Sequence, residues 1–258
     1  MMCILFLTLI FNSSIFADVT WEQQAERLQQ VNAALLDNVP IAEPLRGNRY
    51  LDVRANVMLL PKVNATIGGK SESVPSAPAH MVPTAVFNHV PLDGAIDLGY
   101  RLYAGYLPAG TEKIFKLDAK LSQYTLGGAL LLRKKMSDVS FGLSLGYHLT
   151  SAQLSGAITS PGASDKYACT TSILNVGLQS KFEKLNLWYS FLYGARSSSS
   201  RLNIAEDATQ FDVKDNSPVY QAAIGYDFGS GLQFGVGEEY IPNRLFAARL
   251  IGAYAFNF

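Results

Sequence analysis

The sequence predicts an all-β protein, a closed antiparallel transmembrane β-barrel of about ten strands (roughly eight to twelve), preceded by a short N-terminal helix. From residue 49 to the C-terminus, apolar residues alternate with small or polar ones at a period of two, as β-strands require. Only 16% of residues are charged although 48% are hydrophobic, whereas soluble domains carry about 25% charged residues. No stretch approaches the roughly 18 consecutive apolar residues of a spanning helix. Interleaved lipid-facing and lumen-facing residues explain this combination.

Charge and cysteine content exclude several functions. The 21 Lys and Arg residues balance 21 Asp and Glu residues, so no electrostatic argument favours nucleic acid as a partner. The two cysteines are Cys3 and Cys169, which do not have the spacing of a Cys-based metal site. Since Cys3 lies in a segment that we expect to be removed, we expect no internal disulfide.

Residues 1–17 are interpreted as a signal peptide, with a short apolar core over residues 3–11 and small or polar residues before Asp18. The absence of Lys or Arg before this core is atypical. The apolar run is too short for a membrane-anchoring helix. We therefore expect export through an N-terminal signal peptide.

Residues 18–48 are predicted to form an amphipathic helix and a linker. Apolar residues recur every three or four positions, at Trp21, Ala25, Leu28, Val31 and Leu35. Thr20 and Gln23 form a capping box, and Pro40 ends the pattern. Such a helix could plug the lumen, dock on a periplasmic partner, or lie against the mouth of the barrel.

Residues 49–258 are predicted to form the transmembrane barrel. The alternation is clearest over residues 139–150, where Phe141, Leu143 and Leu145 oppose Gly142 and Ser144. The strand-like segments are 51–59, 82–90, 96–106, 123–133, 139–150, 169–182, 185–194, 220–228, 232–240 and 245–258.

The predicted connections alternate between two lengths. Short turns are expected near residues 91–94, 134–137, 183–184 and 229–231. Long loops are expected near residues 61–81, 107–117, 155–166 and 197–216, with 241–244 as a short exception. Short turns on one rim and long loops on the other are typical of outer-membrane barrels, and this parity puts both barrel termini on the short-turn, periplasmic rim.

The last strand carries aromatic residues at alternate positions, Tyr254, Phe256 and Phe258. It resembles the terminal strand of Gram-negative outer-membrane β-barrel proteins. The resemblance implies that these three residues are an assembly signal for the barrel-assembly machinery, and that this strand closes the barrel against the first strand. It also implies a multi-pass protein in the cell outer membrane, surrounded by outer-membrane lipid. It indicates a porin-like class and no specific family.

The apolar face of each strand is predicted to contact lipid, because the opposite face is mostly small or polar with few charges, which suits a crowded lumen. Aromatic residues near strand ends are typical of interfacial girdles. The candidate lumen-lining residues are Arg54, Asp97, Arg101, Arg133, His148, Lys181, Asp227, Glu239 and Arg249.

Little in the sequence indicates enzymatic chemistry. His80 and His89 do not have metal-site spacing. His148 with Ser144 or Ser151 could form a catalytic group, but a lumen histidine bonded to its neighbours explains the same pattern, and no nucleotide or nucleophile motif is found. We predict no catalytic residue, no metal and no cofactor.

Three functions are compatible with this sequence. We favour a porin-like channel or transporter for small solutes, with a weak preference for anions and with residues 61–81 as a candidate constriction or lid. The alternative is a non-conducting structural or surface-binding barrel, which acts through its long extracellular loops on a surface or periplasmic protein. The third is an outer-membrane enzyme that modifies lipids or peptides, which the sequence favours least.

Overall fold

A computed structural model describes residues 48–67, 70–74, 80–90, 96–114, 117–156, 162, 164–204, 209–242 and 245–257. Within these ranges, side chains are described except at residues 48–83, 107–119, 209, 211, 213, 245, 247 and 257. The predicted signal peptide (1–17) and nearly all of the predicted helix and linker (18–48) lie outside the described residues, as does Phe258 of the predicted assembly signal.

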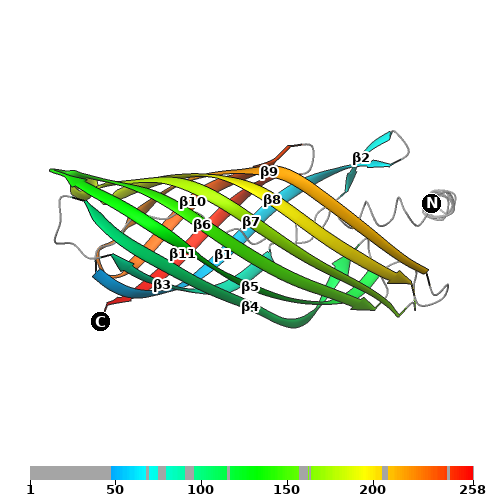
Figure 1. The fold of residues 1–258 in the computed structure, drawn as a ribbon. Coiled ribbons are helices and arrows are strands. Elements are labelled where there is room, and N and C mark those ends of the chain that lie inside the picture. The colour runs from blue at the N-terminus through cyan, green and yellow to red at the C-terminus, as the bar shows by residue number, and fades with distance from the viewer. Residues whose placement is uncertain are drawn as a thin grey trace, which may run out of the picture.

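The described chain forms one antiparallel sheet, coloured along the chain in Figure 1. Its strands are β1 (Asn48–Ile67), β2 (Lys70–Val74), β3 (His80–Val90), β4 (Asp97–Ile114), β5 (Leu117–Met136), β6 (Val139–Gly156), β7 (Asp165–Phe182), β8 (Leu187–Ile204), β9 (Thr209–Asp227), β10 (Leu232–Ile241) and β11 (Leu245–Asn257). β2 pairs only with the end of β1. The other ten described strands form the barrel, which confirms the predicted fold class.

The sheet closes because the last strand pairs with the first. The register runs from Tyr50 opposite Asn257 to Leu59 opposite Ala248, and a bulge precedes Lys62. Closure satisfies the backbone groups that an edge strand would leave unpaired, which is what a lipid environment requires. The start of β1 and the C-terminal end of β11 therefore lie at the same rim (Figure 1).

The two faces of the barrel wall differ as the alternation predicts. On β8, the exposed residues Tyr189, Phe191 and Tyr193 alternate with the buried residues Trp188 and Leu192. We use the term apolar belt for the exposed, outward-facing large apolar side chains, among them Leu98, Leu102, Leu126, Leu130, Leu143, Leu145, Leu174, Val176, Phe191, Ile224, Phe234 and Phe256. A continuous surface of this kind is suited to hydrocarbon. No helix among the described residues is long and apolar enough to cross a membrane.

The connections at the short-turn rim use backbone conformations that permit a sharp reversal. Ser137 has φ of 47° between β5 and β6, and Asn186 has φ of 52° after the single 3-10 turn Glu183–Leu185. Gly229 (77°) and Gly231 (92°) reverse the chain between β9 and β10. These three short connections agree with the sequence prediction, and the fourth, at residues 91–95, lies outside the described residues.

The prediction of long loops is wrong for most of residues 197–216 and 107–117. β8 continues to Ile204 and pairs with β9, with Ser197 opposite Asn216 and Ile204 opposite Thr209. β4 and β5 likewise stay paired as far as Ile114 and Leu117. The predicted loop 61–81 contains the β1–β2 hairpin. Serine-rich and mixed-polarity sequence predicts a loop, but backbone pairing holds these segments in strands.

The overlong strands form what we call the extension: residues 150–156 of β6, 165–172 of β7, 196–204 of β8 and 209–218 of β9. Its outward-facing side chains are polar rather than apolar, and most of them are exposed, including Gln153, Ser155, Lys166, Thr170, Ser197, Ser199, Arg201, Asn203, Gln210, Asp212, Lys214 and Asn216. Because the outward face changes from apolar to polar along the same strands, the extension continues beyond the hydrocarbon.

Candidate functional site in the barrel lumen

Most of the charged residues selected from the sequence lie on the inner face. The buried ones are Asp97, Arg101, Arg133, His148, Asp227, Glu239 and Arg249. The side chain of Lys181 is 14% exposed. The backbone of Arg54 lies in β1 opposite Thr84 and Ala253, and its side chain lies outside the described part of the chain. Their hydrogen bonds and ion pairs gather them into separate groups.

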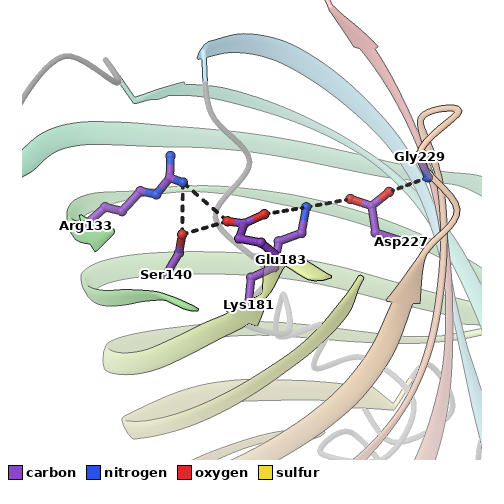
Figure 2. Close-up of polar contacts among 6 residues, drawn as sticks. All are labelled: Arg133, Ser140, Lys181, Glu183, Asp227 and Gly229. Carbon is purple, nitrogen blue, oxygen red and sulfur yellow. Dashed lines mark hydrogen bonds and ion pairs between the residues drawn. The ribbon is translucent and has the colours of Figure 1, made fainter. Parts of the chain in front are cut away.

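The first group lies at the short-turn rim (Figure 2). Lys181 Nζ lies 3.2 Å from Asp227 Oδ2 and 3.6 Å from Glu183 Oε2, so one ammonium group bridges two carboxylates. The other oxygen of Asp227 accepts a hydrogen bond from the backbone N–H of Gly229 at 3.0 Å. Asp227 therefore links the lumen to the turn that begins β10.

The same group continues to β5. Arg133 Nη2 donates to Ser140 Oγ at 3.1 Å, and Ser140 Oγ donates to Glu183 Oε1 at 2.7 Å. Arg133 Nη2 also lies 3.7 Å from Glu183 Oε1. We call Arg133, Ser140, Lys181, Glu183 and Asp227 the rim network. Sequence reasoning missed Glu183 because it lies in a turn, although its position two residues after Lys181 gave a usable signal.

Several buried donors on the inner face have no hydrogen-bond partner among the described residues. They are Nε and Nη1 of Arg133, Nη2 of Arg101, Nε2 of Gln179 and Nε1 of Trp188. Buried polar groups in folded proteins are nearly always paired with protein, water or ligand. Water or the polar groups of a solute would satisfy these donors, so this part of the lumen is suited to hydrated or polar molecules.

A second group joins β9, β10 and β11. Arg249 Nη2 forms an ion pair with Glu239 Oε2, and Gln221 Nε2 donates to the same carboxylate oxygen at 3.0 Å. The side chains of Arg249 and Glu239 are 2% and 0% exposed. Opposite charges at this burial compensate each other's desolvation cost, so the pair lines the wall without net charge.

The third group surrounds His148. Its Nε2 lies 2.9 Å from Thr125 Oγ1 and 3.1 Å from Thr150 Oγ1, and its ring packs 5.2 Å from the ring of Tyr103. Ser151, one of the two serines considered as its catalytic partner, is an odd-numbered residue of β6 and lies on the opposite face from His148. The described contacts of His148 are those of a lumen histidine held by its neighbours. Among the described residues, no group of three or more His, Cys, Asp or Glu side chains could hold a metal ion.

A fourth contact lies at the base of the extension. Arg196 Nη1 donates to Asp215 Oδ2 at 2.7 Å and to Ser217 Oγ at 3.4 Å. Sequence reasoning missed Arg196 and Asp215 because they fell in or beside the segment predicted to be a loop. Continuing the alternation of β8 past Gly194 would have placed Arg196 on the inner face.

Comparisons with known proteins identify the fold. No family model and no curated protein sequence matches this chain. Among solved structures, the translocator domain of the autotransporter NalP from Neisseria meningitidis matches with a TM-score of 0.50 and 11% identity, over 91% of this chain and 95% of that one.

Two further matches are more distant. The outer-membrane protease OmpT from Escherichia coli matches with a TM-score of 0.44 and 13% identity, over 85% of this chain and 99% of that one. Ail, the attachment invasion locus protein of Yersinia pestis, matches with a TM-score of 0.41 and 10% identity, over 82% and 100%. The structural neighbours are Gram-negative outer-membrane β-barrel proteins. The likeness concerns the fold and not the activity.

Proposed function

We propose that this outer-membrane β-barrel is a porin-like channel through which small polar solutes cross the membrane. The observation that carries the proposal is the set of buried, unpaired donors on the inner face, at Arg101, Arg133, Gln179 and Trp188. A lumen that served only as a packed core would be expected to pair such groups with each other. Donors directed into the lumen instead provide hydrogen bonds to water and to passing solutes.

The rim network is the proposed constriction. Arg133, Lys181, Glu183 and Asp227 extend from three different parts of the wall to one level of the lumen (Figure 2). Rings of charged side chains set the selectivity of pores. Because both signs are present in near balance, we expect only a weak preference between anions and cations.

The test is conductance across a planar lipid bilayer with the purified full-length protein. We expect discrete conductance steps, and an altered step size in Arg133→Ala, which shortens a side chain of the constriction. Arg201→Gln is the matched control, because Arg201 is an exposed residue on the outside of the extension. A protein that inserts and folds but gives no steps would contradict the channel.

The extension supports a second candidate, a surface-binding barrel. Its paired strands carry exposed polar side chains on the outward face beyond the apolar belt, and rigid strands present a binding surface with little loss of conformational entropy. Ser199 lies directly opposite Lys214, so residues 200–213 can be replaced by an Asn-Gly turn without changing the register. If binding is the function, this trimmed variant loses capture of a surface partner, and the intact barrel gives no conductance steps.

A further inference from the structure

A carboxylate faces outward from the apolar belt. Along β10 the outward-facing residues are Leu232, Phe234, Val236, Glu238 and Tyr240, all of them exposed. Glu238 is the one acidic side chain at the described outward-facing positions between the short-turn rim and the extension. Ionisable residues at lipid-facing positions are costly, and their presence indicates a specific partner.

Small neighbours leave a groove around Glu238. Its direct cross-strand partners are Ala222 on β9 and Ala248 on β11. Where two alanines flank a longer side chain, the wall is hollowed, and here the hollow has a volume of about 430 Å³. Ile224, Val236, Leu250 and Tyr189 supply its apolar walls. Arg249 also lines it, but its guanidinium is paired with Glu239 on the inner face.

Glu238 forms no hydrogen bond or ion pair with any residue that the structure describes, and the groove opens toward the bilayer. A molecule that fills it must therefore come from the membrane. The groove has apolar walls and one acidic group, which lies toward the long-loop side, next to Tyr240. Tyr240 stacks with Tyr220 at 6.2 Å, which indicates an interfacial aromatic position. An amphipathic molecule with an acyl chain and a cationic head matches both ends of the groove.

We propose that this groove binds a membrane lipid whose headgroup carries a primary ammonium, with the acyl chain along Val236 and Leu250 and the ammonium on the Glu238 carboxylate. A primary ammonium offers three N–H donors to a carboxylate. The quaternary ammonium of a choline headgroup offers none. This lipid site is independent of whether the lumen conducts.

A second copy of the chain is a poorer match for the groove. At the described outward-facing positions, Lys134 is the cation nearest the apolar belt, and it follows Leu132 at the short-turn rim. Glu238 lies toward the opposite rim, three residues before the end of β10. Two copies inserted in the same orientation would hold Glu238 and Lys134 at opposite rims, and this favours a lipid as the source of the ammonium group.

The barrel also contains a matched control groove. A second outward-facing hollow of about 370 Å³ is lined by Ala85, Phe87, Leu102, Ala104 and Leu126, among others, and none of its lining residues is charged. It should accept acyl chains without a preference for the headgroup. Filling it by Ala104→Leu should leave the selectivity at Glu238 unchanged.

The experiment is native mass spectrometry of the purified full-length protein, released from nanodiscs that contain equal amounts of ethanolamine and choline phospholipids with identical acyl chains. We expect the wild type to retain the ethanolamine lipid in about fivefold excess, a ratio that corresponds to about 1 kcal/mol. Glu238→Gln should reduce the ratio to about one, because an amide keeps the shape without the charge. Ala248→Leu should reduce the amount of lipid retained, and Ala104→Leu should keep the excess.

The proposal is overturned if the wild type retains both lipids equally, or if Glu238→Gln keeps the excess. Heat-dependent migration on a gel verifies that each variant is folded. If Ala248→Leu fails to fold, Ala222→Leu fills the same groove from the β9 side. If the barrel keeps its lipid preference but gives no conductance steps, the channel proposal is refuted and the lipid-site proposal stands.

Discussion

The indole ring of Trp188 lies over Gly225, its direct partner on β9, and extends to Gly235 on β10. A Cβ atom at position 225 would lie 2.2 Å from Trp188 Cζ2, and one at position 235 would lie 2.7 Å from it. Tyr103 covers Gly127 on β5 in the same way, with a hypothetical Cβ 2.1 Å from its ring. The inner face therefore accommodates its large aromatic rings by having glycines beside them.

Gly225→Ala should lower the free energy of unfolding by about 1–3 kcal/mol, because the added methyl group overlaps Trp188 and forces the ring or the strand to move. Equilibrium unfolding by urea in lipid vesicles measures the change. Gly252→Ala is the control, because a Cβ at that position meets nothing within 4 Å. Equal effects in the two variants would show that the contact with Trp188 does not constrain this wall.

Asp227→Asn should destabilise the barrel by about 1–3 kcal/mol, because it weakens an ion pair whose side chains are only 14% and 9% exposed. Breaking a fully buried pair costs about 3–5 kcal/mol, and partial exposure and the second carboxylate at Glu183 reduce this. Asp138→Asn is the matched control, since the ion pair of Asp138 with Lys184 lies at the same rim but is 50% and 75% exposed. We expect about 0.5 kcal/mol or less for the control. Unfolding in urea again gives both values.

Arg201 and Asp212 form an exposed cross-strand pair on the extension, with Arg201 Nε 2.8 Å from Asp212 Oδ1. The hydrogen bond from Arg201 holds the pKa of Asp212 below its ordinary value of 3.8. A lowered pKa in the folded state means that the pair contributes stability above the unfolded pKa, and that this contribution is lost as pH falls through the folded pKa. Arg201→Gln should raise the pKa of Asp212 toward 3.8. Titration of the carboxyl carbon by NMR measures it, and an unchanged value would contradict the bond.

Cys169 should be unreactive in the folded barrel. Its side chain is 3% exposed, and Sγ lies 3.3 Å from Ser198 Oγ and 3.8 Å from Thr171 Oγ1 on the inner face of the extension. Burial restricts both access and formation of the reactive thiolate. Maleimide labelling of a chain without residues 1–17, in which Cys169 is the single thiol, should be slow in the folded state and rapid in urea. Ser199→Cys, at an outward-facing neighbour, should label rapidly in both states.

The predicted assembly signal can be tested at Phe256, which is 50% exposed and packs edge-on against Tyr254 at 4.8 Å. Because its outward position leaves the inner packing unchanged, Phe256→Ala should slow machinery-assisted membrane assembly more than it lowers stability. Pulse-chase measurement of heat-resistant barrel gives the rate. Phe234→Ala, another lipid-facing aromatic at 49% exposure, is the control and should assemble at nearly the wild-type rate.

The fold was predictable from the sequence because the alternation is strong wherever lipid touches one side of a strand. Phe141, Leu143 and Leu145 mark β6 without ambiguity, since each faces hydrocarbon and each neighbour faces the lumen. The strand ends were not predictable in the same way. Beyond Ala195 the outward face of β8 is polar and the inner face carries Arg196, Ser198 and Ser200. This segment therefore has the composition of a loop although its backbone is fully paired.

The alternation indicates the face on which a strand residue lies, but not which residues meet. The odd-even alternation assigns Lys181 and Asp227 to the lumen, yet 46 positions separate them, and the pairing of β7, β8 and β9 brings their charges together. Glu183 lies in a turn rather than a strand, so the alternation along β7 does not by itself place it, although it follows Lys181 by two residues. The alternation along β10 places Glu238 on the lipid-facing side. Its neighbours Ala222 and Ala248 belong to β9 and β11, so the groove around it forms only when the three strands pair.

The extension makes the barrel a natural scaffold for displaying foreign peptides. From Ala195 to Ile204, β8 advances about 30 Å along its own axis, and its pairing with β9 keeps that length stiff. An epitope inserted between Ile204 and Thr209 would be carried away from the bilayer by its own hairpin. Antibody access to such an insert would then depend on how far the hairpin rises above the membrane surface, rather than on the length of a flexible tether.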